Sequence, residues 1–150
     1  MISKKTKYAL KALEELAHCS GNDCPVLISS LAKKRKIPQK FLEAILLELK
    51  NNGILQSKKG KGGGYFLAKK PSQIKLGAVL RILEGPLAPL PCLSHTAYEK
   101  CKECDDEATC AIRLMMKEAY EKAVDFLDHT TLQEMVDHTR NAELSVNYSI

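Results

Sequence analysis

The stretch ISSLAKKRKIPQKFLEAILLELKNNGILQSKKGKGGGYFLA, residues 28–68, contains the pattern that decides the fold. The spacing of its apolar residues predicts a helix over 28–36 and a second over 39–51, joined by a tight turn at Ile37-Pro38. Asn52-Gly53 ends the second helix, since glycine readily takes the left-handed conformation that follows a helix end. Two helices joined by so short a turn form a helix-turn-helix pattern.

A basic hairpin follows directly. Apolar runs at 54–57 and 65–68 predict two short strands, and the segment between them holds three lysines and four glycines. Two strands joined by a flexible basic loop form the wing of a winged helix. The predicted fold class is therefore mainly α with a small β-hairpin wing: a winged helix-turn-helix joined to a long dimerisation helix.

Helical patterns flank this centre on both sides. Ser3 is the expected N-cap of a first helix, and a short helix is expected over 77–83. A long helix is expected over 110–127, and a final helix begins at Thr131-Leu132-Gln133-Glu134, which matches a capping box. The chain is expected to fray from Asn141 onward.

Three parts are predicted along the chain. Residues 1–85 form the DNA-binding winged helix-turn-helix. Residues 86–109 are rich in proline, cysteine and charge and show no helical period, so they are expected to form a functional loop, here a cysteine-rich sensor. Residues 110–150 hold the dimerisation helix and the C-terminal helix.

Composition and charge narrow the class of partner. An apolar content of 45% with 5% aromatic residues and no tryptophan favours helical packing over a β-sandwich. Residues 1–75 hold 16 Lys/Arg and 5 Asp/Glu, a net charge of +11, whereas residues 76–150 hold 7 and 13, a net charge of −6. A basic front half indicates a polyanion such as nucleic acid as the partner.

The expected location follows from what the sequence lacks. No apolar run approaches the roughly 18 residues that a membrane span needs, and the N-terminus does not resemble a signal peptide. A cytoplasmic protein is therefore expected, without membrane association, and in that compartment thiols stay reduced and structural disulfides are rare. No nucleophile–base pair or carboxylate dyad emerges from the pattern, so no enzyme is expected.

The second helix of the motif is the candidate for the DNA major groove. The expected apolar stripe of this helix comprises Phe41, Leu42, Ile45, Leu46 and Leu49. The first turns present Gln39, Lys40 and Glu43 away from this stripe, and these three residue types can pair with adenine, guanine and cytosine edges respectively. Ordinary exposed residues of a surface helix are the alternative. In the wing, lysines supply charge for phosphates and glycines let the backbone come close. The predicted wing contacts are Lys58, Lys59, Lys61, Gly62, Gly63 and Tyr65.

Four cysteines with the spacing C-x8-C-x2-C-x5-C are the candidate metal ligands: Cys92, Cys101, Cys104 and Cys110. Thiolates are soft donors that suit iron–sulfur clusters and zinc. Nearby cations, Lys100, Lys102 and Arg113, are expected to favour the thiolate form, as is the helix start at Cys110. Three alternatives stay open beside an iron–sulfur cluster: a four-cysteine zinc site, a metal-free switch with a Cys101–Cys104 disulfide, and a purely structural role.

Two further cysteines, Cys19 and Cys24, stand five positions apart at a helix end. They are expected to be inert thiols rather than a second site.

The order of these elements resembles the IscR/NsrR/CymR (Rrf-type) family of bacterial winged helix-turn-helix regulators. The resemblance runs from Lys7-Tyr8-Ala9-Leu10 to Thr131-Leu132, and its most specific pieces are Gly62-Gly63-Gly64-Tyr65 and the cysteine cluster. It implies a homodimer on near-palindromic, double-stranded promoter DNA. It also implies a [2Fe–2S] or [4Fe–4S] cluster held by three cysteines, which the apo form of the protein lacks. The state of this cluster would set the affinity for DNA in response to iron–sulfur supply, nitric oxide or redox stress.

Cys92, Cys104 and Cys110 match the three family cysteines, and Cys101 is an addition. Some members ligate with a histidine three residues after the last cysteine, where this chain has Arg113, and others use an acidic residue of the partner's first helix, which is absent here before Glu14. Cys101 is therefore the expected fourth ligand and His95 its main rival. Family members dimerise through the long helix, which implies a contact face made of Ile112, Met115, Met116, Ala119, Ala123 and Phe126.

The predicted function is thus a homodimeric transcriptional regulator, repressor or activator, controlled by an iron–sulfur cluster on the cysteine loop. The alternatives are a regulator of the same fold governed by thiol oxidation or by a partner protein, and a zinc-stabilised adaptor whose winged helix binds protein.

Overall fold

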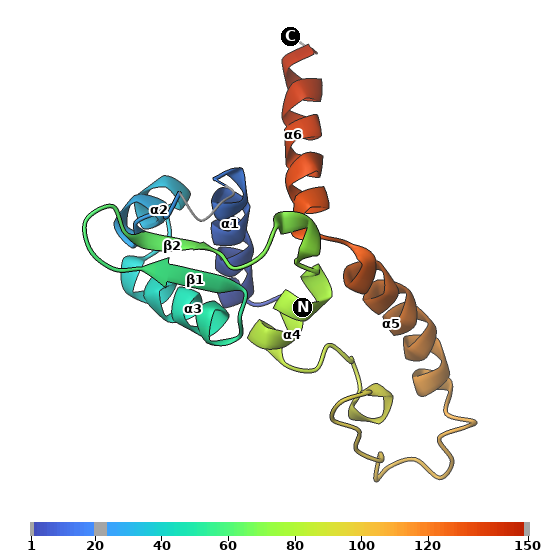
Figure 1. Ribbon diagram of the computed structural model, residues 1–150. Helices are drawn as coiled ribbons and strands as arrows, with labels where there is room; N and C mark the ends of the chain where they lie inside the picture. Colours follow the sequence, from blue (N-terminus) through green and yellow to red (C-terminus); the bar gives the residue numbers. More distant parts are fainter. Residues whose placement is uncertain (1, 20–23, 149–150) are drawn as a thin grey trace.

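The computed structural model describes residues 2–19 and 24–148, and it is mainly helical with a two-stranded antiparallel hairpin, as predicted (Figure 1). The elements are α1 Lys4–His18, α2 Ile28–Arg35, α3 Gln39–Asn51, β1 Leu55–Lys58, β2 Gly64–Leu67, the 3-10 helix η1 Pro71–Gln73, α4 Leu76–Glu84, the 3-10 helix η2 Pro91–Leu93, α5 Ala111–His129 and α6 Leu132–Tyr148.

The turn between α2 and α3 has a defined backbone cause. Lys36 ends α2 in the left-handed conformation with φ 54°, and the N–H of Ile37 donates to the carbonyl oxygen of Ala32 at 2.9 Å. Pro38 then caps α3. Because the left-handed residue reverses the chain within one step, α3 starts at once and the predicted helix-turn-helix is confirmed.

The wing is β1, β2 and the loop 59–63 between them. Leu55 pairs with Leu67 and Lys58 with Gly64. Backbone hydrogen bonds in both directions, each 2.9 Å, also join Tyr65 to Val26, just before α2. Gly64 has φ 147°, and a Cβ there would lie 2.3 Å from the Val26 oxygen, so only glycine allows this approach. The wing is therefore attached to the entrance of the helix-turn-helix.

A single main core joins α1, α2, α3, the wing, α4 and the start of α6. Its fully buried side chains come from the apolar stripes that the sequence indicates. They include Leu13, Leu16, Leu31, Leu42, Ile45, Leu46, Leu49, Leu55, Val79 and Leu132. Phe41, expected on the apolar side of α3, is 43% exposed and packs only edge-on against the Tyr8 ring, with centroids 5.8 Å apart.

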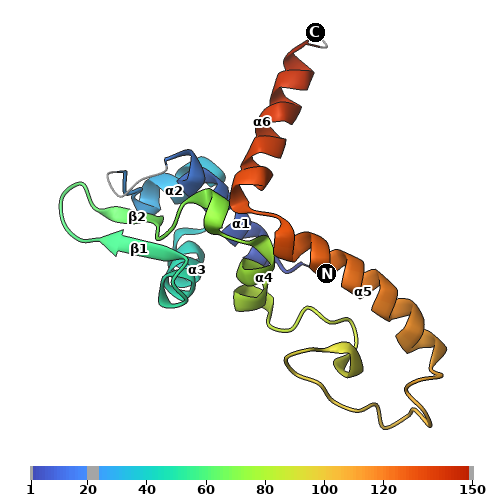
Figure 2. The same ribbon diagram turned by 45° about the vertical axis from the view of Figure 1, so that its right-hand side comes forward.

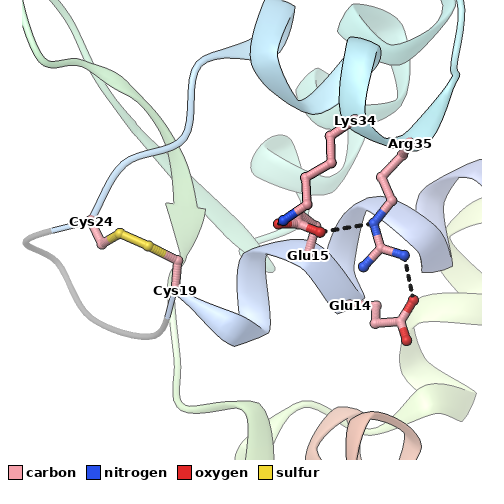
Figure 3. Close-up of polar contacts among 6 residues, drawn as sticks. All are labelled: Glu14, Glu15, Cys19, Cys24, Lys34 and Arg35. Atoms are coloured by element: carbon pink, nitrogen blue, oxygen red, sulfur yellow. Dashed lines mark hydrogen bonds and ion pairs between the residues drawn. A yellow bond between two sulfur atoms is a disulfide. The ribbon is translucent and has the colours of Figure 1, made fainter. Parts of the chain in front are cut away.

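Ion pairs hold α2 against α1 (Figure 3). The buried Glu15 carboxylate accepts hydrogen bonds from Lys34 and from Arg35 Nε, the latter at 2.9 Å, while Arg35 Nη1 donates to Glu14 at 3.0 Å. Burial would raise the pKa of Glu15, but the two cations outweigh it and the pKa is lowered. Lys34 and Arg35, near the end of α2, are thus paired with carboxylates of α1.

Cys19 and Cys24 form a disulfide, so the expectation that they are inert, unpaired thiols is wrong (Figure 3). Cys19 is the C-cap of α1, and Cys24 lies two residues before Val26, which the wing holds in place. Their Cα atoms are 5.8 Å apart, within the range that a disulfide requires. Spacing alone does not reveal this pairing, because it depends on where α1 ends relative to the wing.

Two long helices leave this body in different directions (Figures 1 and 2). Gly77 of α4 lets α5 approach, since a Cβ there would lie 2.0 Å from the Asp128 carboxylate, which also pairs with Arg81 at 2.9 Å. The predicted capping box is confirmed: Thr131 N donates to Glu134, and Glu134 N donates back to the Thr131 hydroxyl at 3.2 Å. Helix α6 continues to Tyr148, so the expected fraying from residue 141 is wrong.

In both views the wing and the cysteine loop, residues 86–109, lie at opposite ends of the molecule. Among the described residues, no helix combines the length and hydropathy that a membrane crossing needs.

Candidate DNA interface and cysteine site

The exposed start of α3 and the wing meet at a groove. Gln39 of α3 lines a cavity of about 380 Å³ together with Lys58, Lys59 and Tyr65 of the wing. These four predicted DNA contacts come from separate elements, and the fold brings them together. Ser29 of α2 lines the same cavity and was not foreseen, because its hydroxyl gives no sequence signal beyond that of a helix residue.

The other predicted contacts lie outside the groove. Lys40 and Glu43 are exposed on α3, where Glu43 accepts a hydrogen bond from Gln39 Nε2 at 3.1 Å. Lys61 and Gly62 are exposed in the wing loop. Within the described part of the chain, none of the lysines at 40, 58, 59 and 61 pairs with a carboxylate, in contrast to Lys34 and Arg35 of α2. The charge of the wing is therefore free for phosphates.

Gly63 differs from the other wing glycines because it is buried. A Cβ at this position would lie 2.2 Å from the Lys58 carbonyl oxygen and 2.8 Å from that of Gly60. Its N–H donates to the Gly60 oxygen at 3.0 Å. Gly63 thus shapes the loop, whereas Gly62, with φ 75° and no atom within 4 Å of its Cβ position, leaves open backbone.

The four loop cysteines line one cavity of about 440 Å³, the cysteine cavity. Cys92 is buried in η2, and Cys101, Cys104 and Cys110 are partly exposed. Cys110 is also the N-cap of α5. Residues 18 positions apart in the sequence are thus held at one place by η2 on one side and the start of α5 on the other.

The thiols at the start of α5 are electrostatically unequal. A hydrogen bond from the Arg113 backbone N–H, followed by one from Cys104, lowers the pKa of the Cys110 thiol. The same contact with Cys110 raises the pKa of Cys104 to about 11, with burial and Cys101 adding to it. Helix-start donors therefore concentrate the negative charge on Cys110, and the expected stabilisation of thiolates does not extend to Cys104.

Within residues 2–19 and 24–148, no three His, Cys, Asp or Glu side chains are grouped closely enough to hold a metal ion. The donor set still fits a soft metal site, because four thiols face one cavity. Glu99 and Glu103 line it as well and add oxygen donors that were not foreseen. His95, the expected rival ligand, lines a different cavity and faces the Tyr120 ring at 6.1 Å.

Helix α5 exposes most of the predicted dimerisation face. Ile112, Met115 and Phe126 are each more than 60% exposed, and Ala119 and Ala123 are exposed too. Met116 instead packs against a small cluster formed by Cys92, Leu93 and Tyr120, which is the second hydrophobic core of the chain. The long helix therefore buries one side against η2 and leaves the other uncovered.

Comparisons with known proteins agree over nearly the whole chain. The family model Rrf2, described as an iron-dependent transcriptional regulator, matches residues 2–138. An rrf2-like HTH-type transcriptional regulator of Rhodobacter capsulatus is 43% identical over 138 residues, which cover 91% of this chain and 92% of that protein. The HTH-type transcriptional regulator CymR of Bacillus subtilis is 30% identical over 138 residues, covering 92% and 91%.

Solved structures give the same result. The structure of CymR, described as the global cysteine regulator of B. subtilis, superimposes with a TM-score of 0.76 at 29% identity and covers 92% of this chain and 97% of that one. T. potens IscR superimposes with a TM-score of 0.73 at 25% identity, covering 95% and 90%.

Proposed function

This chain belongs to the Rrf2 family of DNA-binding transcriptional regulators, and we propose that it acts in the cytoplasm as a homodimer whose affinity for promoter DNA is set by an iron–sulfur cluster in the cysteine cavity. One observation carries the proposal: Cys92, Cys101, Cys104 and Cys110 face the same cavity. Four thiolates suit an iron–sulfur cluster, and the family description as iron-dependent supports this metal over zinc.

The DNA half of the proposal rests on the groove between α3 and the wing. Gln39 begins the helix that would enter the major groove, and Lys58 and Lys59 would contact the phosphates beside it. Gln39 is the candidate for direct base contact, together with Lys40 and Glu43 farther along α3. A near-palindromic operator fits a two-fold dimer.

The coupling between the two sites runs through α5. Cys110 is the N-cap of α5, so ordering the loop around a bound cluster would fix the first turn of this helix. If the exposed face of α5 pairs with a second copy, its first turn sets the spacing of the two α3 helices on DNA. Half-sites are a whole helical turn apart, so a small rotation would affect several contacts together.

A second candidate, a metal-free thiol switch, is favoured by one observation. Among the described residues, no three potential ligands are grouped closely enough to hold a metal ion, while Cys110 and Cys101 lie near enough to Cys104 to raise the pKa of its thiol. An oxidant such as a peroxide would take two electrons and two protons from such a pair and leave a disulfide and water. Similarity to CymR, the global cysteine regulator of B. subtilis, supports control without a cluster.

The deciding experiment is anaerobic purification followed by a visible spectrum and analysis of iron, sulfide and zinc. The proposal expects a coloured protein with iron and acid-labile sulfide, and with DNA affinity that changes when the cluster is removed. A colourless protein that takes up no iron during reconstitution supports the thiol switch. Stoichiometric zinc supports the adaptor, which salt-sensitive binding to duplex DNA would eliminate.

Cys101→Ala tests whether the cluster is held by all four loop cysteines or by Cys92, Cys104 and Cys110 alone. If Cys101 is the fourth ligand, the variant loses or converts the cluster spectrum; if three cysteines suffice, the spectrum is retained. Cys104→Ala is the matched control, because it removes a thiol that belongs to both ligand sets and should abolish the cluster in either case.

The DNA interface is tested by replacing Lys58, Lys59 and Lys61 with Gln. Each phosphate that a lysine no longer neutralises should reduce the slope of log K against log salt by about 0.9, so the slope of the triple variant should fall by up to about 2.7. A variant with Lys117, Lys122 and Arg140 replaced by Gln has the same net charge and should keep the wild-type slope. Equal slopes in the two triple variants would reject the wing as a phosphate-binding element.

A further inference from the structure

A second cavity, of about 260 Å³, lies beside the cysteine cavity between η2 and α5. Cys92 and Arg113 line both cavities and thus stand between them. The second cavity contains no cysteine other than Cys92, so it is not part of the proposed cluster site. We call it the arginine pocket.

The arginine pocket contains an unsatisfied donor. The Nε atom of Arg113 is buried and has no hydrogen-bond partner among the described residues. A buried N–H without an acceptor destabilises a protein by about 1–3 kcal/mol, and more when the group is charged. Among the described residues no carboxylate pairs with Arg113 either, so the charge of its guanidinium is available to an anion that enters the pocket.

A second cation faces the same pocket. The Lys117 ammonium is 3.7 Å from the Glu121 carboxylate, one turn along α5, and both side chains are about half exposed. A long, exposed ion pair of this kind holds its charges weakly, so Lys117 is available to another anion. Two cations, Arg113 and Lys117, and one carboxylate, Glu121, line the pocket, so its net charge is positive.

The remaining walls combine a hydroxyl with aromatic rings. The buried Ser94 hydroxyl oxygen accepts a hydrogen bond from the Ala97 N–H at 2.9 Å, which leaves its own hydrogen to be donated. The rings of His95 and Tyr120, tilted by 31° with centroids 6.1 Å apart, also line the pocket. A pocket lined by charged donors and aromatic rings suits an anionic head on a flat or apolar body.

We propose that the arginine pocket binds a small organic carboxylate, with its head on Arg113 and Lys117 and its body against Tyr120. The volume lies just below the range of about 300–1,000 Å³ for drug-sized ligands, so the ligand has on the order of ten non-hydrogen atoms. Because Arg113 and Cys92 also line the cysteine cavity, a ligand bound in the arginine pocket would affect the cysteine loop. The site adds a second input to the regulator and does not depend on the iron–sulfur proposal.

The test uses the full-length, metal-free chain without DNA, so its outcome is independent of the cluster. The Nε–H group of an arginine gives a side-chain signal in a ¹H–¹⁵N NMR spectrum, and Arg113→Lys assigns it by its disappearance. Benzoate, a carboxylate on a flat ring, should shift this signal saturably, with a Kd of about 1 mM. Benzamide has the same shape without the charge and should leave the signal in place.

Two variants locate the binding. Lys117→Gln retains the Arg113 signal and should weaken the binding of benzoate about tenfold. Lys122→Gln, on the opposite side of α5, should bind benzoate with the affinity of the wild type. The proposal is overturned if benzoate fails to saturate the shift, if benzamide or inorganic phosphate matches benzoate, or if both lysine variants behave alike. Circular dichroism spectra equal to the wild type confirm that each variant is folded.

Discussion

The N-terminal body and the cysteine arm differ in how they are held together. The body, α1 to α4 with the wing and the start of α6, contains the main core and every fully buried large side chain that the structure describes. The cysteine arm, residues 86–129, buries only Cys92, Leu93, Ser94 and Tyr120. Helix α5 has 19 residues, of which Tyr120 alone is buried.

The difference indicates where each part obtains its stability. A helix gains most of its stability in a protein from packing its apolar face, and α5 does this over only one side. The DNA-binding body is complete within one chain. The arm keeps four cysteines at one cavity and leaves an apolar face of α5 exposed. Both features would suit the proposed cluster and the proposed dimer contact.

Core packing in α3 should show the largest effect on the body. Leu46 is 0% exposed, and Leu46→Ala should lower the free energy of unfolding by about 3 kcal/mol, because apolar surface is no longer buried and a cavity remains. Leu47, the next residue, is 50% exposed, so Leu47→Ala should change the free energy of unfolding by less than about 1 kcal/mol. Urea denaturation measures both, and similar losses would contradict the described core.

Removal of the Cys19–Cys24 disulfide should have the second largest effect on the stability of the body. Replacing Cys19 and Cys24 by Ser frees a short loop in the unfolded chain, which should reduce stability by about 2 kcal/mol by the loop-entropy estimate. Wild-type protein kept in dithiothreitol should unfold at the same urea concentration as the double variant. If the oxidised and reduced wild-type proteins have the same midpoint, the bridge does not stabilise the body.

In the cysteine arm, self-association should be sensitive to a charge introduced on the exposed face of α5. Met115 is 63% exposed in one chain, so Met115→Glu should leave its folding intact but weaken self-association at least about tenfold, since a carboxylate would be buried at the interface. Leu114→Glu places the same group one residue away, about 100° around α5. Analytical ultracentrifugation separates the two variants, and a reversed order would move the dimer contact to another face.

The smallest effect concerns pH and the contact between the chain start and α4. Hydrogen bonds from Thr6 and Ser3, whose N–H is 2.7 Å from Glu84, lower the pKa of Glu84 from 4.5 to about 2. A lowered pKa stabilises the folded state above pH 4.5, and this contribution is lost as pH falls toward 2. Its size is below about 1 kcal/mol because the group is partly solvated.

Glu84→Gln should therefore flatten the decrease of Tm between pH 4.5 and 2. Glu118→Gln, which removes an exposed carboxylate paired with Lys122, should leave the wild-type profile. A profile for the Glu84 variant that is as steep as that of the wild type would show that the hydrogen bonds do not persist in solution.

Local signals explain most of what the sequence predicted correctly. The helix-turn-helix, the wing and the Thr131 capping box depend on residues close together in the chain, and each is found within a few positions of its expected place. Errors arose where the outcome depended on distant partners. Phe41 is 43% exposed and meets the Tyr8 ring edge-on, and the Cys19–Cys24 bridge joins the end of α1 to the segment that leads to Val26, which pairs with the wing.

The cysteine site was predicted in the same uneven way. Sequence spacing identified the four thiols that share a cavity, but it could not separate them from His95, which a short loop carries to the other side of Cys92. It also could not reveal that Arg113 stands between two cavities.

The sequence by itself determined the order of the elements, the positive wing and the set of sulfur donors, because periodicity, glycine placement and residue chemistry act over a few neighbouring positions. Only the tertiary structure decided which groups face one another. It placed Gln39 beside the wing lysines, packed Met116 and Tyr120 against η2 while leaving Met115 exposed, and left the Arg113 Nε without a partner among the described residues. A periodic pattern defines the face of a helix, but the partner of that face is set by packing across the whole chain.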